Sequence, residues 1–249
     1  MKNKINVLKV GITPCSYTEI AKTIAGAIKT GTTIHIVTAN AAMITAAWKD
    51  RQLSRCLDEA EMVTADGMSV VWAIRFLGNK AIDRVTGIDA AYKIFKQAEK
   101  LGHRIFLLGA AQEVLMSAVK VIQKQFPALI LAGFHHGYFK SDTVMVSIIK
   151  KVRPDILLVG MGFSMQEKWI YNNKTSLDIP VIMGVGGTFD VISGEIPRAP
   201  VWMQKTGLEW LFRLLQEPQR LWKRYLVSNT MFIYNVLKMK LSGKGKWIQ

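Results

Sequence analysis

The stretch DILLVGMG, residues 155–162, decides the fold class of this chain. After its first residue it contains only apolar residues and glycine. A run of this kind is typical of a strand that is buried on both faces, as in a parallel sheet covered by helices. Five further runs of similar character occur along the chain: IHIVTAN (34–40), MVTAD (62–66), RIFLLGA (104–110), ALILAGF (128–134) and VIMGVGG (181–187).

The segments between these runs have helical patterns. We expect helices over AAMITAAWKDRQLSRCLDEA (41–60), GMSVVWAIRFLG (67–78) and AAYKIFKQAEKLG (90–102). Buried strands that alternate with amphipathic helices predict an α/β protein. The sequence thus predicts a Rossmann-like core over residues 1–195, with a largely parallel sheet and helices on both faces.

The composition agrees with a globular protein. Of the 249 residues, 50% are hydrophobic and 20% are charged, which excludes a disordered chain and allows one sizeable core with a small appendage. Cys15 and Cys56 are the only cysteines and form no CxxC motif, as is typical of a reducing cytosol. The N-terminal residues lack the apolar run of a signal peptide, and no apolar stretch is long enough to cross a bilayer. We therefore expect a protein that does not span a membrane.

Positive charge is concentrated at the end of the chain. The formal net charge is +15, and residues 198–249 carry 10 Lys/Arg against 2 Asp/Glu. No acidic residue follows Glu217. A block of like charge usually indicates a polyanionic partner, and a solvated basic face is the alternative.

The stretch EWLFRLLQEPQRLWKRY, residues 209–225, combines aromatic rings with cationic side chains. Pro218 ends one helical pattern in it and suits the first turn of a second helix. We expect residues 196–249 to form a helical, basic appendage whose partner is a nucleic acid, a membrane surface or the protein's own core. Apolar residues with helical spacing in the first of these helices are Leu208, Leu211, Phe212 and Leu215.

Polar and glycine-rich positions cluster where the expected strands end. Ligands of open α/β sheets bind outside the carboxyl ends of the strands. Glycines there let the backbone approach a phosphate, and the helix that follows offers unpaired N–H groups to it. Any one of these glycines could only make a tight turn, but together the strand ends predict a nucleotide-type site. The positions are Thr38, Asn40, Asp66, Gly67, Gly109 and the segments 133–138, 160–166 and 184–190.

Several kinds of chemistry are excluded by missing motifs. The first expected strand is not followed by G-x-G-x-x-G, so a dinucleotide-dependent oxidoreductase is not expected. GFSMQ (162–166) fails as a nucleophile elbow at Gln166, where a small residue is needed. Zinc-ligand spacing and an Asp-x-Asp pair are both absent from the sequence, so we expect no metal and no cofactor. Any phosphate is then expected to be held by backbone N–H groups and arginines.

A set of motifs covering roughly residues 34–226 resembles the WecG/TagA/CpsF glycosyltransferases, glycosyltransferase family 26. The motifs occur in the family's order: TANAA, ADGMSVVWAIR, RVTGID, FLLG, HGYF, PDILLVGMG, QEKWI, GVGGTFDVISGEIPRAP and GLEWLFRLLQEPQRLWKRY. The resemblance implies an enzyme that moves a sugar from a UDP-sugar donor to an undecaprenyl-diphosphate-linked acceptor in cell-wall or surface polysaccharide synthesis. TagA-like members transfer N-acetylmannosamine to lipid-linked N-acetylglucosamine in teichoic acid synthesis, and others transfer N-acetylmannosaminuronic acid or glucose.

The same resemblance implies roles for individual residues. Asp66 matches the family's proposed catalytic base. An inverting sugar transfer needs one carboxylate to take the proton of the acceptor hydroxyl. The alternative role for Asp66 is that of an N-cap of the next helix. Thr38, Asn40 and Arg84 match positions that line the sugar and diphosphate pocket. The residues expected near the nucleotide are Gly109, Ala110, Tyr138, Gly162, Gln166, Gly186 and Asp190, of which Asp190 has a loop cap as its alternative role.

The resemblance also decides how the basic appendage is interpreted. Arg213, Arg220 and Arg224 are expected to point toward the acceptor diphosphate, which arginine grips bidentately. Trp and Tyr settle at headgroup level while Lys and Arg meet anionic lipids, so we expect peripheral association with the inner, cytoplasmic face of the cell membrane. Nucleic acid would explain the appendage but not the strand-end loops, and it is not expected as a partner. Homo-oligomer formation is left open.

The chain departs from the family pattern at one place. Where the family usually has G-x-P-K-Q-E, Ser164 and Met165 replace the proline and the lysine, whereas Gln166 and Glu167 are kept. The site is expected to survive, with an altered affinity for the donor or a different donor. A non-catalytic nucleotide- or nucleic-acid-binding protein is the alternative function.

Overall fold

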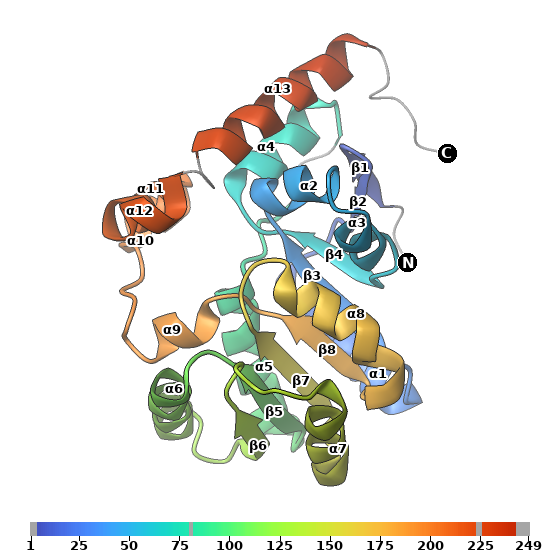
Figure 1. Cartoon of the computed structure of the whole chain (residues 1–249), viewed down its shortest axis with the longest axis vertical. Coiled ribbons are helices and arrows are strands. Elements are labelled where there is room, and N and C mark those ends of the chain that lie inside the picture. The colour runs from blue at the N-terminus through green and yellow to red at the C-terminus, as the bar shows by residue number, and fades with distance from the viewer. Residues whose placement is uncertain (1–3, 80–81, 223–225, 243–249) are drawn as a thin grey trace.

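The computed structural model describes residues 4–79, 82–222 and 226–242, without the side chain of Arg220. Its centre is a six-stranded parallel sheet in the order β4–β3–β8–β7–β5–β6 (Figure 1). The α/β, Rossmann-like fold expected from the sequence is confirmed, as are its six strands. Their bounds are β3 Ile34–Ala39, β4 Met62–Ala65, β5 Arg104–Gly109, β6 Ile130–His135, β7 Ile156–Gly160 and β8 Val181–Gly184.

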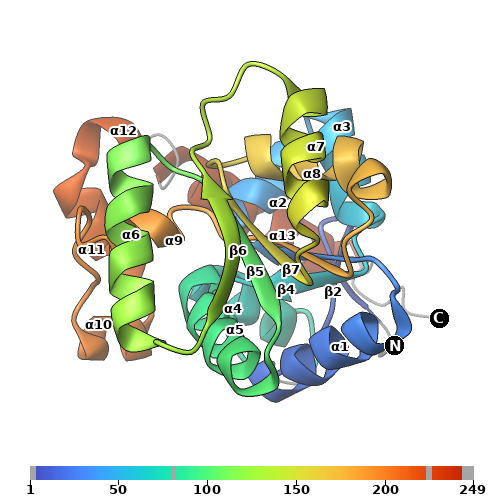
Figure 2. The ribbon, with the colours of Figure 1, turned by 90° about the horizontal axis from the view of Figure 1, so that it is seen from below.

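Helices cover both faces of this sheet. Successive side chains of a strand point to opposite faces, and Ile36 and Val37 of β3 accordingly lie in different hydrophobic clusters. Figure 2 shows α1 and α5 on one side of the sheet and α7 and α8 on the other. The helices of the core are α1 Tyr17–Thr30, α2 Ala41–Ala47, α3 Arg51–Asp58, α4 Met68–Phe76, α5 Gly87–Leu101, α6 Gln112–Gln125, α7 Asp142–Val152, α8 Met165–Leu177 and α9 Thr188–Ile192.

The expectation of one helix over residues 41–60 is wrong. The segment forms two helices, α2 and α3, separated by a turn. The turn is stabilised by Asp50, whose extended backbone ends the helical run and whose carboxylate accepts a hydrogen bond from the N–H of Leu53 at 3.0 Å. An N-cap aspartate of this kind satisfies an N–H group that has no partner within the helix.

A short antiparallel hairpin precedes the sheet and was not anticipated from the sequence. Strand β1 (Ile5–Val7) pairs with β2 (Val10–Ile12), and the two residues between them, Leu8 and Lys9, both have positive φ. Two positive φ values are what a tight hairpin turn requires. The N–H of Thr13 donates to the carbonyl of Val63 at 2.7 Å, which ties the hairpin to β4. Its apolar side chains join the cluster that covers β3 and β4.

The C-terminal part of the chain is helical, as expected. Its helices are α10 Val201–Thr206, α11 Glu209–Gln216, α12 Pro218–Trp222 and α13 Ser228–Leu241. Pro218 is the first residue of α12, as its fixed φ predicts. Helix α13 lies across α2 and α4 (Figure 1), and its Phe232 and Val236 are fully buried in the cluster that includes β1 and β2. The functional division near residue 195 stays a prediction. Among the described residues, none of the helices combines the length and apolarity that a bilayer crossing requires.

Candidate active site

A large cavity opens at the carboxyl ends of β4, β3, β8 and β7. Its volume is about 860 Å³, which suits a nucleotide-sugar-sized ligand. These four strands end at the same edge of the parallel sheet, and the segment after each of them contributes to the wall. The appendage closes the opposite side with residues of α11, α12 and α13. Of the residues predicted for the site, those lining the cavity are Thr38, Asn40, Asp66, Arg84, Gly162, Gln166, Gly186, Asp190 and Arg213.

Asp66 lies in this wall between β4 and α4. Its N–H donates to the carbonyl of Ala39 at 2.8 Å, which fixes the backbone of the β4 end to that of β3. The helix that follows begins at Met68, and its N-cap is Gly67, whose φ of 130° is one that L residues rarely adopt. The alternative role of Asp66 as an N-cap is therefore wrong. Asp66 is one of the residues that line the cavity.

Thr38 and Asn40 hold the end of β3. The hydroxyl of Thr38 donates to the carbonyl of Gly184 at 3.4 Å, across the sheet to β8. The side-chain oxygen of Asn40 accepts from the N–H of Met43 at 3.0 Å and so caps α2. Both residues thus have a structural role while lining the same cavity as Asp66.

Gln166 and Glu167 position the loop after β8. The side-chain oxygen of Gln166 accepts from the N–H of Gly186 at 3.0 Å, and its amide nitrogen donates to Glu167 at 2.7 Å. Both side chains are buried, and a Cβ on Gly184 would lie 2.6 Å from that nitrogen. Gln166 therefore ties the glycine loop after β8 to the first turn of α8. The substituted residues Ser164 and Met165 are not among those that line the cavity.

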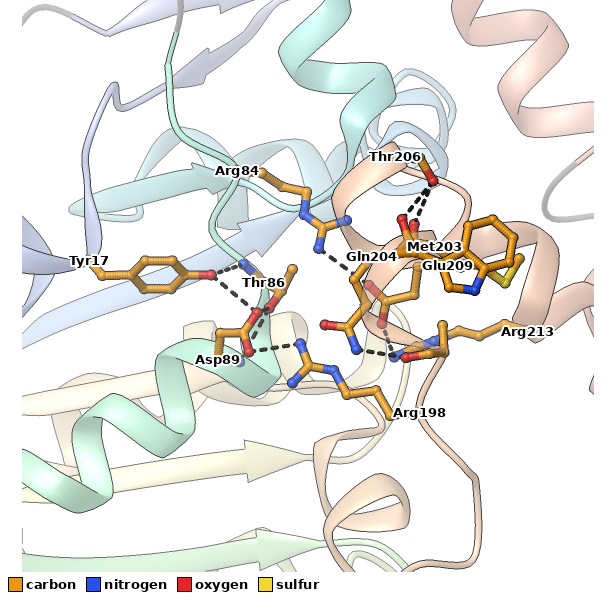
Figure 3. A network of polar contacts seen from close by, with 12 residues as sticks. Tyr17, Arg84, Thr86, Asp89, Arg198, Met203, Gln204, Thr206, Glu209 and Arg213 are labelled. Atoms are coloured by element: carbon orange, nitrogen blue, oxygen red, sulfur yellow. Dashed lines mark hydrogen bonds and ion pairs between the residues drawn. The ribbon is translucent and has the colours of Figure 1, made fainter.

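Arginines reach the cavity from two distant parts of the chain. The carboxylate of Glu209, the first residue of α11, lies 3.4 Å from the guanidinium of Arg84 and 3.5 Å from that of Arg213 (Figure 3). Arg84 precedes α5, so this ion-pair cluster joins the core to the appendage. Sequence inspection singled out both arginines but not the glutamate between them. The side chain of Arg220 and the whole of Arg224 lie outside the described residues.

A second polar network anchors the start of the appendage. Arg198 donates to the carboxylate of Asp89 at 2.7 Å, and Asp89 also accepts from the hydroxyl of Thr86 at 2.7 Å (Figure 3). Burial alone would raise the pKa of Asp89, but the hydrogen bonds from Thr86 and Arg198 lower it below its ordinary value. Tyr17 completes the network by accepting from the N–H of Thr86 at 3.1 Å. Burial raises the pKa of this phenol, and the carboxylates of Asp89 and Asp66 add to the effect.

Three predicted nucleotide residues are not among those that line the cavity. Gly109 is the last residue of β5 and Ala110 follows it, with the N–H of Ala110 donating to the carbonyl of Gly160 at 2.9 Å. A Cβ on Gly109 would lie 2.2 Å from that carbonyl oxygen, so only glycine fits there. Tyr138 follows β6 and is 77% exposed. The sheet order explains their position, because β5 and β6 lie beyond β7 from the cavity. Their role in binding stays a prediction.

The cavity also has an apolar side that sequence inspection missed. Met68 and Trp72 of α4 line it together with Trp210 of α11 and with Leu226 and Ile233 near and in α13. We call these five residues the apolar mouth. The residues are far apart in the sequence, so no local pattern could have grouped them. Among the described residues, His, Cys, Asp and Glu side chains nowhere gather in a group of three that could hold a metal ion.

Comparison with known proteins assigns the chain to a family. The family model "Glycosyl transferase WecG/TagA/CpsF family" matches residues 5–246. The chain belongs to this family. It is therefore a glycosyltransferase, and the resemblance found in the sequence motifs is confirmed.

Curated relatives cover most of the chain. An N-acetylglucosaminyldiphosphoundecaprenol N-acetyl-beta-D-mannosaminyltransferase of Bacillus subtilis (strain 168) is 36% identical over 84% of this chain and 81% of its own length. The protein of the same name from Staphylococcus aureus (strain MW2) is 35% identical over 83% of this chain and 81% of its own length. A solved structure of an arylmalonate decarboxylase mutant covers 78% of this chain and 83% of its own with a TM-score of 0.23, a likeness too weak to carry an argument.

Proposed function

We propose that this glycosyltransferase moves N-acetylmannosamine from a UDP-sugar to an N-acetylglucosaminyl-diphosphoundecaprenol acceptor. The names of its relatives describe this acceptor and this sugar. The observation that carries the proposal within the chain is the position of Asp66 in the wall of a cavity that also holds Arg84 and Arg213. A carboxylate supports proton removal, and arginines support the binding of diphosphates.

The reaction we propose is a single displacement with inversion. The acceptor hydroxyl attacks the anomeric carbon of the donor sugar, and its proton passes to the carboxylate of Asp66. The bond between the anomeric carbon and the UDP oxygen breaks as the new glycosidic bond forms, and UDP leaves with the bonding electrons. One carboxylate is sufficient because the diphosphate is a good leaving group that needs no proton from a second acid.

The diphosphates are proposed to lie against the arginine side of the cavity. Arg84 and Arg213 already flank a carboxylate, that of Glu209, at 3.4 and 3.5 Å. A phosphate oxygen makes the same charge-assisted contacts with guanidinium groups as a carboxylate oxygen does. The predicted contributions of Arg220 and Arg224 would extend this arginine group toward the acceptor.

The appendage is proposed to rest on the anionic surface of the membrane that holds the acceptor. Trp202 of α10 and Trp222 of α12 are 60% and 44% exposed. Aromatic residues of this kind are stable at headgroup level, and the basic charge after residue 198 would be attracted by anionic lipids. Peripheral binding of this kind would bring the cavity to the lipid-linked acceptor.

The test is a transfer assay with a panel of UDP-sugars and a synthetic lipid-diphosphate acceptor that ends in N-acetylglucosamine. We expect release of UDP and formation of a disaccharide lipid with UDP-N-acetylmannosamine. Transfer from UDP-N-acetylmannosaminuronic acid or UDP-glucose instead would overturn the donor but keep the reaction. Nucleotide binding without transfer from any donor of the panel would favour the non-catalytic alternative and overturn the proposed function.

A further inference from the structure

We infer that the apolar mouth binds the first isoprene units of the acceptor's lipid chain, so that part of the prenyl group lies in the protein rather than in the bilayer. This inference rests on the proposed function, because it takes the polyprenyl-diphosphate acceptor as its ligand. Its observational basis is the arrangement of acidic, cationic and apolar groups along one cavity.

The apolar mouth exposes large apolar side chains next to polar machinery. The exposed fractions are 36% for Met68, 39% for Trp72, 37% for Trp210, 54% for Leu226 and 42% for Ile233. All five line the same cavity as Asp66 and Arg84. Soluble surfaces avoid grouping such side chains unless they meet an apolar ligand or partner.

The cavity combines the kinds of group that a sugar–diphosphate–prenyl acceptor requires. Asp66 lies at the base of α4, at the sheet, and Met68 and Trp72 follow on one face of that helix, one turn apart. The segment before α11 contacts Met68 directly, since a Cβ on Gly207 would lie 2.5 Å from its Cγ. Two residues later, Glu209 holds Arg84 and Arg213. A carboxylate, an arginine pair and an apolar region thus lie close together in the wall of one cavity.

A sugar–diphosphate–prenyl molecule offers a partner for each of these three kinds of group. Its sugar hydroxyl must reach the carboxylate, its diphosphate then meets the arginines, and its prenyl chain must continue from there. Helix α13 contributes Ile233 to the wall of the cavity, and Leu226, just before the start of that helix, lines it as well. Burying prenyl carbons against these side chains removes apolar surface of both from water, which favours binding.

The test compares farnesyl diphosphate with inorganic diphosphate as ligands of the full chain, in the absence of membranes and detergent. Binding is measured by calorimetry and by the fluorescence of the tryptophans, two of which lie in the apolar mouth. We expect farnesyl diphosphate to bind at least about tenfold more tightly than diphosphate. Equal affinities would overturn the inference, and because no transfer is measured, that result is distinct from a failure of the proposed function.

Variants from two walls of the mouth locate the effect. Ile233→Gln on α13 and Met68→Gln on α4 should each reduce the preference for farnesyl diphosphate by about fivefold or more. The matched control is Leu237→Gln, one turn along α13, because Leu237 is 40% exposed and is not among the lining residues. This control should keep the preference.

Three outcomes would overturn the inference. An unchanged preference in both mouth variants would show that the prenyl group binds elsewhere. An equal loss in Leu237→Gln would show a general property of the surface of α13. Weaker binding of UDP with an unchanged prenyl preference would show that the mouth receives the nucleobase instead. Circular dichroism of each variant checks that the fold is intact.

Discussion

At the scale of single residues, Asp66 offers the sharpest test of the chemistry. It lies between the last residue of β4 and Gly67, the N-cap of α4, and it lines the cavity. Asp66→Asn should lower turnover by about 100-fold or more, the usual scale of an acid–base contribution, because an amide cannot accept the acceptor's proton. Steady-state rates of UDP release measure the effect. UDP affinity serves as the control and should stay close to that of the unmodified chain, whereas near-normal turnover would remove Asp66 from the mechanism.

The backbone conformation of Ser164 is incompatible with proline, the residue that the family usually has at this position. Ser164 precedes α8 with φ 67° and ψ −31°, in a region that L residues rarely adopt. The ring of proline holds φ near about −65°, so proline cannot occupy this conformation. A proline at position 164 would therefore require a different local backbone.

This conformation predicts opposite effects of two substitutions on stability. Ser164→Gly should raise the free energy of unfolding by about 1 kcal/mol, because glycine adopts the strained conformation without penalty. Ser164→Pro should lower it by more than about 1 kcal/mol, because the loop must rearrange. Urea denaturation measures both. A proline variant as stable as the unmodified chain would contradict the positive φ.

At the scale of elements, strand β3 carries a buried histidine that makes stability depend on pH. The ring of His35 is fully buried, and its two nitrogens have no hydrogen-bond partner among the described residues. Burial, together with the charge of Lys174, lowers the pKa of His35 to about 3. The folded protein therefore holds the ring neutral, whereas the unfolded chain protonates it near its ordinary pKa of about 6.5.

The sign of the effect follows from proton binding. Between the two pKa values the unfolded state binds one more proton than the folded state, so stability falls as the pH is lowered from about 6.5 toward 3. From about pH 7.5 to about pH 5, the unmodified chain should lose about 2 kcal/mol more than His35→Leu, which has no titrating group. Urea denaturation at the two pH values measures the difference. Equal losses in the two proteins would contradict the neutral, buried ring.

Substitutions in helix α13 test whether this helix is packed against the folded core in solution. Phe232 is fully buried against α2 and α4, whereas Tyr234 on the same helix is 62% exposed. Phe232→Ala should lower the free energy of unfolding by about 3–5 kcal/mol, the cost of a large cavity in a packed core. Tyr234→Ala, as the matched control, should change it by less than about 0.5 kcal/mol. Similar small effects of both substitutions would mean that α13 is not docked in solution.

At the scale of the whole molecule, the appendage should determine membrane binding. The double variant Trp202→Ser, Trp222→Ser should reduce sedimentation with anionic liposomes by about tenfold, because both rings leave the headgroup region. The matched control is Met116→Ser on α6, which is 44% exposed, as is Trp222. Binding of the unmodified chain should weaken as salt rises, since screened charges contribute to it. If the double variant binds as the control does, the exposed tryptophans do not contact lipid.

The sequence by itself determined the strands, the family and the position of Asp66, and each rests on local information. An apolar run such as DILLVGMG identifies a buried strand because burial on both faces requires apolar residues throughout. Asn40 and Asp66 directly follow β3 and β4 in the sequence, so their place at the edge of the sheet is a consequence of chain order. The broken helix over residues 41–60 shows the limit of such patterns, since the capping of α3 by Asp50 competes with helix continuation.

Only the tertiary structure decided which strand ends share a cavity. The order of strands places β7 between β8 and β5, which takes Gly109 and Tyr138 away from Asp66 although all lie at the same edge. The contact of Glu209 with Arg84, the bond from Arg198 to Asp89 and the docking of α13 each join segments more than a hundred residues apart. Periodicity describes neighbours along one helix or strand, whereas these contacts depend on how whole elements pack. The ion-pair cluster and the apolar mouth exist only once that packing has formed.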